Sequence, residues 1–270
     1  MDQVIDVKGK VAMVTGCSSG LGRAFAKALA RHGARVALCA RRADRLQELA
    51  AEIAKEGGSA LAVPLDVSDV SATRDAAARI ERDLGPIDIL VNNAAVTKQA
   101  AVVDAEPDYF DSIYATNIRG AFFVAQAAAR QMIKHQRHGR IVNIGSDAAL
   151  RTMRRQAVYS SAKAALIHAS KVMALEWAPY NINVNVVCPG YIATEMSAGF
   201  ENTPVGKSFI SSLPRGRVGK PEDLAGMILL LSSGEAARFI TGTVIQVDDG
   251  WLLSDGAQGL TGEGQLGQAF

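Results

Sequence analysis

A tyrosine and a lysine four residues apart could carry out acid–base chemistry in this chain. Tyr159 and Lys163 would share one face of a helix, because residues four apart are neighbours on a helix surface. A free phenol has a pKa of about 10, too high for efficient proton transfer near neutral pH. A nearby ammonium group favours the phenolate and lowers that pKa. Tyr159 could then exchange a proton with a substrate oxygen.

Ser146 could assist the same reaction. It follows the strand-like run Arg140–Ile144 and precedes Tyr159 by thirteen positions. A hydroxyl at that point could donate a hydrogen bond to a substrate oxygen as negative charge develops there. A Tyr-x-x-x-Lys pair by itself is common on helix surfaces. It gains specificity from its context, which includes Ser146 at a strand end and Asn117 in the preceding helical segment.

A glycine-rich turn near the start of the chain could hold a dinucleotide. It reads Thr15-Gly-Cys-Ser-Ser-Gly-Leu-Gly22 and joins an apolar run to a helical segment. Glycines allow a tight turn close to a pyrophosphate, and the helix start offers that anion free N–H groups and a favourable dipole. The spacing Gly-x-x-x-Gly-x-Gly differs from the usual Gly-x-Gly-x-x-Gly fingerprint. A purely structural turn is the alternative interpretation.

The residues after the second apolar run indicate which dinucleotide is bound. An acidic residue there would bind the ribose hydroxyls of NAD, whereas an arginine accommodates the 2′-phosphate of NADP. The acidic residue is absent, and Arg41 and Arg42 follow instead. NADP(H) is therefore favoured and NAD(H) is possible. The alternative is a solvated helix start, because Arg45 continues the basic run.

These residues need a scaffold, and the apolar pattern predicts one. Seven short runs rich in Val and Ile alternate with segments of helical spacing, which is typical of parallel strands buried on both faces. We therefore expect an α/β fold with a Rossmann-like, doubly wound parallel sheet of about seven strands and helices on both faces. The predicted strands are Val11–Thr15, Val36–Ala40, Leu61–Leu65, Ile87–Asn92, Ile141–Ile144, Val184–Cys188 and Val244–Val247.

Ligands bind such sheets at the carboxyl ends of the strands. Asp66 stands at one of these ends and could accept a hydrogen bond from the adenine amino group, or Asp66 or Ser68 could cap the next helix. No linker divides the chain, so residues 1–253 form one domain. Within it, residues 190–217 are expected to be a substrate lid. The glycine-rich residues 254–270 form a tail.

The overall composition excludes several classes of protein. The 270 residues carry a net charge of +2 without a basic tract, which argues against a nucleic-acid binder. There is no signal-peptide pattern and no apolar run long enough to span a membrane. The three cysteines form no CxxC pair and the four histidines show no ligand spacing, so we expect free thiols, no metal site and a cytoplasmic location.

Together these features resemble the short-chain dehydrogenase/reductase family over Lys8–Leu252. The matching positions are Thr15-Gly16-x-x-x-Gly20-x-Gly22, Asp66-Val67, Asn92-Asn93-Ala94, Asn117, Ser146, Tyr159-x-x-x-Lys163, Pro189-Gly190 and Thr194. The resemblance implies an NADP(H)-dependent oxidoreductase that interconverts a carbonyl and a secondary alcohol by hydride transfer. It also implies that Arg41, just past the usual acidic position, is the residue that points to NADP. It also implies a homotetramer in which the helices 117–135 and 159–179 pair across a subunit interface.

The resemblance also implies individual roles. Tyr159 is the acid in reduction and the base in oxidation, while Lys163 lowers the tyrosine pKa and holds the nicotinamide ribose. Ser146 orients the carbonyl, and Asn117 supports a proton relay through water to Lys163. The positions expected to bind the cofactor are Gly16, Ser18, Ser19, Gly20, Leu21, Gly22, Arg41, Arg42, Asp66, Val67, Asn93, Ala94, Tyr159, Lys163, Pro189, Gly190, Ile192 and Thr194.

The chain departs from the family pattern at two places. Ala95 stands where a glycine is usual, which narrows the space near the adenosine ribose. Asp248-Asp249-Gly250 replaces the common Asp-Gly-Gly, in a region of subunit contacts.

Two other functions are alternatives. A reductase of 3-oxoacyl thioesters, carried on acyl carrier protein or CoA, is suggested by Arg137, although Tyr180 stands where that group of enzymes has a second arginine. A non-catalytic NADP-binding sensor or scaffold is the other, but such proteins usually lose catalytic groups that this chain keeps. The basic cluster Arg151, Arg154 and Arg155 could attract an anionic substrate or could lie in a solvated loop.

Overall fold

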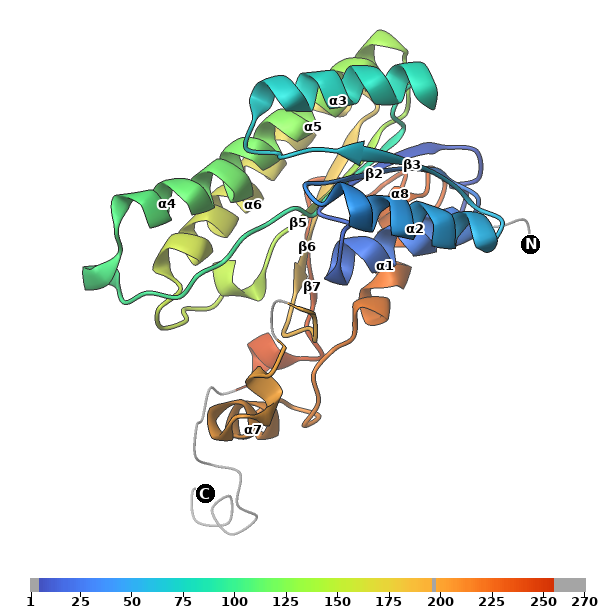
Figure 1. Ribbon diagram of the computed structural model, residues 1–270. Coiled ribbons are helices and arrows are strands. Elements are labelled where there is room, and N and C mark those ends of the chain that lie inside the picture. The colour runs from blue at the N-terminus through green and yellow to red at the C-terminus, as the bar shows by residue number, and fades with distance from the viewer. Residues whose placement is uncertain (1–4, 196–197, 255–270) are drawn as a thin grey trace.

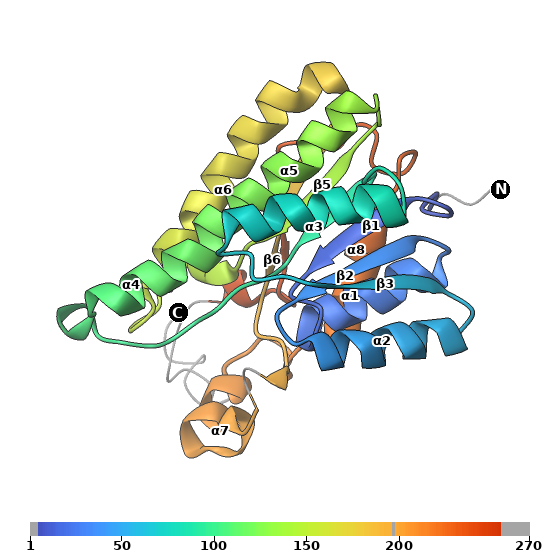
Figure 2. The same cartoon turned by 45° about the horizontal axis from the view of Figure 1, so that its top comes forward.

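The sheet has seven parallel strands in the order β3-β2-β1-β4-β5-β6-β7, in a computed structural model that describes residues 5–195 and 198–254. Helices cover both faces of it, as Figures 1 and 2 show. The predicted doubly wound α/β fold is therefore confirmed. The strands are β1 Val11–Thr15, β2 Arg35–Ala40, β3 Ser59–Pro64, β4 Ile89–Asn92, β5 Arg140–Ile144, β6 Asn183–Pro189 and β7 Val244–Val247.

The third and fourth strands begin at residues other than those predicted. The fourth strand begins at Ile89 and not at Ile87, because the Ile87 N–H is bonded to the Gln131 side chain at 3.2 Å and not to the ladder. The third begins two residues earlier than predicted, since Ser59 and Ala60 are in register with β2. These shifts do not change which face of the sheet each side chain meets.

The helices form two layers. On one face α1, α2 and α8 pack against β1 and β2, and on the other α3, α5 and α6 pack against the same sheet. Successive residues of β1 enter opposite cores: Ala12 and Val14 face the first layer, Val11 and Met13 the second. The helices are α1 Gly20–Arg31, α2 Ala43–Lys55, α3 Val70–Asp83, α4 Pro107–Tyr114, α5 Ala121–Lys134, α6 Ala157–Trp177, α7 Pro204–Ser211 and α8 Ala225–Ser232.

The strand order reverses between β1 and β4. The chain leaves β1 towards β2 and β3, then returns to the other side of β1 for the remaining strands. The loops after β1 and β4 therefore part at the carboxyl edge, which is where doubly wound sheets bind ligands. At this same edge the segment with α7 extends away from the sheet (Figure 1).

The predicted lid contains a helix, α7, that is not among the elements expected from the sequence. Thr203 caps α7 by accepting from the Gly206 N–H at 2.9 Å, and Pro204 occupies its first position. A capping threonine followed by proline is a helix-start signal. Lid residues 196–197 and tail residues 255–270 lie outside the described part of the chain.

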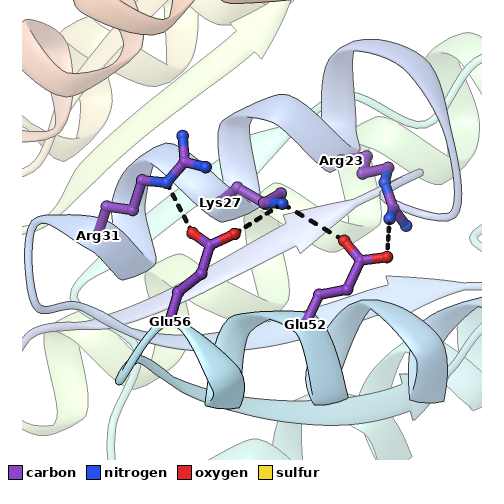
Figure 3. A network of polar contacts seen from close by, with 5 residues as sticks. All are labelled: Arg23, Lys27, Arg31, Glu52 and Glu56. Atoms are coloured by element: carbon purple, nitrogen blue, oxygen red, sulfur yellow. Dashed lines mark hydrogen bonds and ion pairs between the residues drawn. The ribbon is translucent and has the colours of Figure 1, made fainter.

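Ion pairs join α1 to α2 beside the glycine-rich turn (Figure 3). Arg23 pairs with Glu52, and Lys27 bridges Glu52 at 3.4 Å and Glu56 at 2.9 Å. Arg31 closes the row on Glu56 at 2.7 Å. These side chains are partly exposed, so solvent screens the pairs and each contributes little to stability. Their effect is to fix the orientation of α2, whose start carries the arginines after β2.

No helix in the described residues is long and apolar enough to cross a membrane.

Candidate functional site

Ser146, Tyr159 and Lys163 meet at the carboxyl edge of the sheet. Ser146 lies two positions after the end of β5 and is hydrogen-bonded to Tyr159, which lies in the first turn of α6. Lys163 is one turn further, and its Nζ lies 5.9 Å from the centroid of the Tyr159 ring. That Nζ donates to the Ile144 carbonyl at 2.7 Å, which anchors the ammonium group to the end of β5. The helix spacing thus brings the three side chains together as the sequence predicts.

Loss of hydration controls the charges of this group. Burial raises the pKa of Tyr159, and the hydrogen bond with Ser146 acts in the opposite direction. Burial also lowers the pKa of Lys163 to about 8, since its side chain is 2% exposed. We expected Lys163 to hold the Tyr159 pKa below its usual value. In the protein without cofactor the loss of hydration dominates, and the Tyr159 pKa is raised instead.

Asn117 lies in a π-helical segment, Ala115–Gly120, between α4 and α5. Its side chain is fully buried and pairs with the backbone of Val96: Nδ2 donates to the Val96 carbonyl at 2.8 Å, and the Val96 N–H donates to Oδ1 at 2.9 Å. This amide therefore fixes the loop after β4 next to the site. A proton relay from Asn117 to Lys163 stays a prediction.

The glycine-rich turn has no space for larger residues. A Cβ on Gly22 would lie 2.5 Å from the Gly16 carbonyl oxygen, and one on Gly16 would lie 2.8 Å from the Ala94 Cα. Gly16 and Gly20 also have positive φ angles of 66° and 53°. Asn93 supports the turn, because its Nδ2 donates to the carbonyls of Thr15 and Gly16 at 3.0 and 3.3 Å. The predicted positions Asn93 and Ala94 thus pack directly on the turn.

This turn fits a pyrophosphate. Ser19 is the N-cap residue of α1, but its hydroxyl accepts from Arg42 at 3.0 Å and, within the described chain, caps no N–H of the helix. The first-turn N–H groups, including that of Leu21, are therefore available to an anion. The close backbone packing and positive φ angles give the tight approach that such a ligand requires.

Arg42 and not Arg41 lies over the glycine-rich turn. Its guanidinium donates to Ser18 Oγ at 3.0 and 3.2 Å and faces Glu195 of the lid at 3.6 Å. The pairing of Glu195 with Arg42 could not be predicted from the sequence, because nothing in the pattern around Glu195 links it to a residue 153 positions earlier. Arg42 is thus the arginine best placed for a cofactor phosphate at this turn.

The charge of Arg41 acts on Asp66. Burial acts to raise the pKa of Asp66, but hydrogen bonds from Ser68 and the charge of Arg41 outweigh it, so that pKa is lowered. The Ser68 N–H and hydroxyl donate to Asp66 Oδ1 at 3.0 and 2.7 Å. The idea that Asp66 or Ser68 caps α3 is wrong: Asp69 is the N-cap and accepts from the Ala72 N–H at 3.0 Å. Asp66 and Ser68 are engaged with each other one turn earlier.

The residues expected on the nicotinamide side follow β6 and cross towards the turn. A Cβ on Gly190 would lie 2.8 Å from the Asp248 Cα, so the chain passes close to the end of β7. Ile192 pairs with Gly219 in a parallel bridge. Thr194 then reaches Gly20, since its methyl carbon would be 3.3 Å from a Cβ placed there. Pro189 ends β6, and Val67 is buried after β3.

The three arginines between Ser146 and Tyr159 have different environments. Arg151 donates to the Trp251 carbonyl at 3.1 Å and stacks over the Trp251 ring at 5.3 Å. Arg154 and Arg155 are exposed. Arg151 is therefore engaged in contacts with Trp251, whereas Arg154 and Arg155 face solvent. If this cluster attracts an anion, Arg154 and Arg155 would do so.

Arg137 lies away from the site. It precedes β5, at the amino end of the sheet, and its Nε faces Asp88 at 3.7 Å. Ser146, Tyr159 and Lys163 are at the opposite, carboxyl end of the same strand. The predicted contact of Arg137 with an acyl carrier would therefore have to form at the edge of the sheet opposite to the reacting groups.

Comparisons with known proteins agree with this geometry. A family model described as enoyl-(acyl carrier protein) reductase matches residues 16–252. The chain is 39% identical over 255 residues to a gluconate 5-dehydrogenase of Gluconobacter oxydans, covering 93% of this chain and 98% of that protein.

Two solved structures extend the comparison. A short-chain type dehydrogenase/reductase from Mycobacterium marinum is 38% identical with a TM-score of 0.86, over 92% of this chain and 97% of that chain. A gluconate 5-dehydrogenase from Burkholderia cenocepacia, in complex with NADP and tartrate, is 32% identical with a TM-score of 0.88, over 93% and 99% of the two chains.

Proposed function

Because the chain belongs to the short-chain dehydrogenase/reductase family, we propose that it is an NADP(H)-dependent oxidoreductase that interconverts a carbonyl and a secondary alcohol. The observation that carries this proposal is the meeting of Ser146, Tyr159 and Lys163 beside a turn that fits a pyrophosphate. A bound nicotinamide supplies or accepts the hydride. The test is oxidation of NADPH by the purified protein with a broad panel of carbonyl compounds.

The side chains divide the remaining work. Tyr159 gives its hydroxyl proton to the carbonyl oxygen during reduction and takes it back from the alcohol during oxidation. Ser146 orients that oxygen through its own hydroxyl and stabilises the negative charge that develops on it. Lys163 places a positive charge next to the Tyr159 ring, which stabilises the phenolate that remains after reduction and that accepts the alcohol proton in oxidation. Cofactor binding without any turnover would instead favour a sensor or scaffold.

We expect Arg42→Ala to weaken NADPH binding by about 10- to 100-fold with little change for NADH. Charge-assisted hydrogen bonds to a phosphate are worth about 1.5–3 kcal/mol, and NADH lacks the 2′-phosphate. The measurement is the dissociation constant of each cofactor by fluorescence titration. Arg45→Ala is the matched control, because Arg45 lies on the next turn and pairs with Glu48.

A wild-type preference for NADH, or equal losses for both cofactors in Arg42→Ala, would contradict the phosphate contact. Arg41→Ala separates the two arginines: a smaller selective loss than in Arg42→Ala is expected, because Arg42 contacts the glycine-rich turn whereas the charge of Arg41 acts on Asp66.

The substrate is proposed to be a polyhydroxylated carbonyl compound. The relative from Gluconobacter oxydans is a gluconate 5-dehydrogenase, and Arg154 and Arg155 are available to attract an acid group. Keto-sugar acids should therefore react with a higher kcat/KM than neutral ketones, and added salt should reduce that advantage. Acetoacetyl thioesters belong in the same panel. A higher kcat/KM for them than for keto-sugar acids would favour the alternative function, a reductase of 3-oxoacyl thioesters.

We further propose a cytoplasmic homotetramer. The apolar side chains Phe122 and Val172 are partly exposed and line a groove between α5 and α6 with Trp177. Light scattering should give about four times the mass of the 28.5 kDa chain. Val172→Glu should reduce that mass, and Val205→Glu on α7 is the control. A wild-type monomer would contradict the proposal.

A further inference from the structure

A buried carboxyl group next to Ser146 has no part in the reaction proposed above. Asp147 is 1% exposed, and in the described residues no donor reaches either of its carboxyl oxygens. Its backbone is firmly held, because the Asp147 carbonyl accepts from the N–H groups of Leu150 and Arg151 at 2.9 and 2.8 Å. An isolated charged carboxylate in such a place would be strongly unfavourable. Asp147 therefore requires a partner or a proton.

The partner is Asp248, which follows β7. The two carboxyl groups are in hydrogen-bonding contact. Asp248 already accepts from the N–H groups of Gly250 at 3.0 Å and Leu252 at 2.7 Å. Two ionised carboxylates are acceptors only, so a hydrogen bond between them needs one proton. Asp248 accepts hydrogen bonds from two N–H groups, whereas no donor in the described residues reaches the Asp147 carboxyl group. We therefore place the proton on Asp147, which donates it in a hydrogen bond to Asp248.

We propose that Asp147 and Asp248 share one proton, and that this bond makes Asp147 a positioning residue that holds the Ser146 turn against the turn after β7. The proposal rests on the proposed function in so far as Ser146 is taken to orient the substrate. The bond itself is a property of the protein without ligand.

The turn after β7 links the pair to the lid. Trp251 is part of this turn, and its ring packs edge to face against Phe209 of α7 at 5.6 Å. Arg151, four residues after Asp147, both stacks on Trp251 and donates to its carbonyl. The segment after Ser146 and the lid helix therefore share Trp251 as a common support. Loss of the proton would place two negative charges side by side in the interior and push these parts away from Ser146.

The other ionisable groups around Asp147 do not replace this proton. Cys188 of β6 faces Asp147, but burial raises the pKa of its thiol to about 11, so it is neutral near pH 7. Lys163 of α6 acts on Cys188 and is bonded to Ile144, and Arg151 is directed to Trp251. Burial first and the charge of Asp248 second raise the pKa of Asp147 to about 7. The bond therefore exists below that pH and is lost above it.

Fluorescence of Trp251 tests the bond without any turnover. The chain has two tryptophans, so a Trp177→Phe background leaves Trp251 as the single reporter. Between pH 5 and 9 the emission of Trp251 should change with a midpoint near 7, as the turn loses its contact. Asp147→Asn should abolish this transition, because the amide donates to Asp248 at every pH. Asp248→Asn is a second variant, expected to abolish it too if Asp147→Asn does not fold.

The kinetic readout is the pH dependence of kcat/KM for carbonyl reduction. Wild-type kcat/KM should fall by roughly tenfold per pH unit above about pH 7. Asp147→Asn should lack this decrease. It should keep only the decrease caused by deprotonation of Lys163, whose pKa is about 8. An unchanged fluorescence transition in both Asn variants, or a flat wild-type emission, would overturn the shared proton. Absence of turnover with the transition intact would count against the proposed function alone.

Discussion

Replacing Tyr159 by phenylalanine should reduce kcat for carbonyl reduction by about a thousandfold or more. General acid catalysis by a positioned group contributes on the order of 10²–10⁴ in rate, and Phe has no proton to give. The ring itself is kept, so its packing beside Lys163 is preserved. Since the change removes an interaction made with the reacting oxygen, kcat should fall with little effect on the dissociation constant of NADPH.

The experiment measures kcat and NADPH affinity for Tyr159→Phe with the best carbonyl substrate from the panel. Tyr180→Phe is the matched control: it removes a phenolic hydroxyl from a half-exposed residue just after α6 and should leave both quantities unchanged. Thermal melts should place Tyr159→Phe within about 1 kcal/mol of wild type, because one hydrogen bond with Ser146 is lost. Turnover within a few-fold of wild type would show that another group supplies the proton.

That Ser146, Tyr159 and Lys163 lie together could be predicted from the sequence, because each of them is tied to a regular element. Ser146 lies two positions after the end of a strand whose five residues are all buried, and such a strand is easily recognised from its apolar run. Tyr159 and Lys163 are one helical turn apart, so the period of the helix fixes their relation. The glycine-rich turn is likewise local: Gly16 and Gly22 meet across six residues of chain.

Contacts between distant loops were beyond the same reasoning. Arg151 and Trp251 are 100 positions apart, and no periodic pattern connects them. Asp147 and Asp248 meet only because β5, β6 and β7 are neighbours in the sheet and end at the same edge. The sequence favours Arg41 for the 2′-phosphate, whereas Arg42 lies over the glycine-rich turn, because the outcome depends on how the start of α2 faces Ser18. Register and loop conformation, which residue types specify weakly, decide all three.

Replacing Lys163 by methionine should inactivate the enzyme and at the same time stabilise it. Burial lowers the lysine pKa from 10.5 to about 8, a shift that corresponds to about 3 kcal/mol of unfavourable charge burial at neutral pH. Methionine keeps the unbranched shape but loses the bond to the Ile144 carbonyl, at a cost of about 1–3 kcal/mol. The net gain is up to about 2 kcal/mol, or a few degrees in Tm.

The pH dependence of this gain identifies its cause. The unfolded chain binds more protons than the folded one between pH 8 and 10.5, so wild-type stability rises with pH across that window. The advantage of Lys163→Met should therefore be full below about pH 8 and disappear towards pH 10.5. Urea unfolding at pH 7 and pH 10 measures it, with Lys134→Met, an exposed lysine paired with Glu81, as the control that should show neither effect. At pH 7 kcat should fall by about 10²-fold or more, because the charge beside Tyr159 is gone. A variant that is less stable than wild type at pH 7 and equally so at pH 10 would mean that the Ile144 bond, and not the buried charge, governs this position.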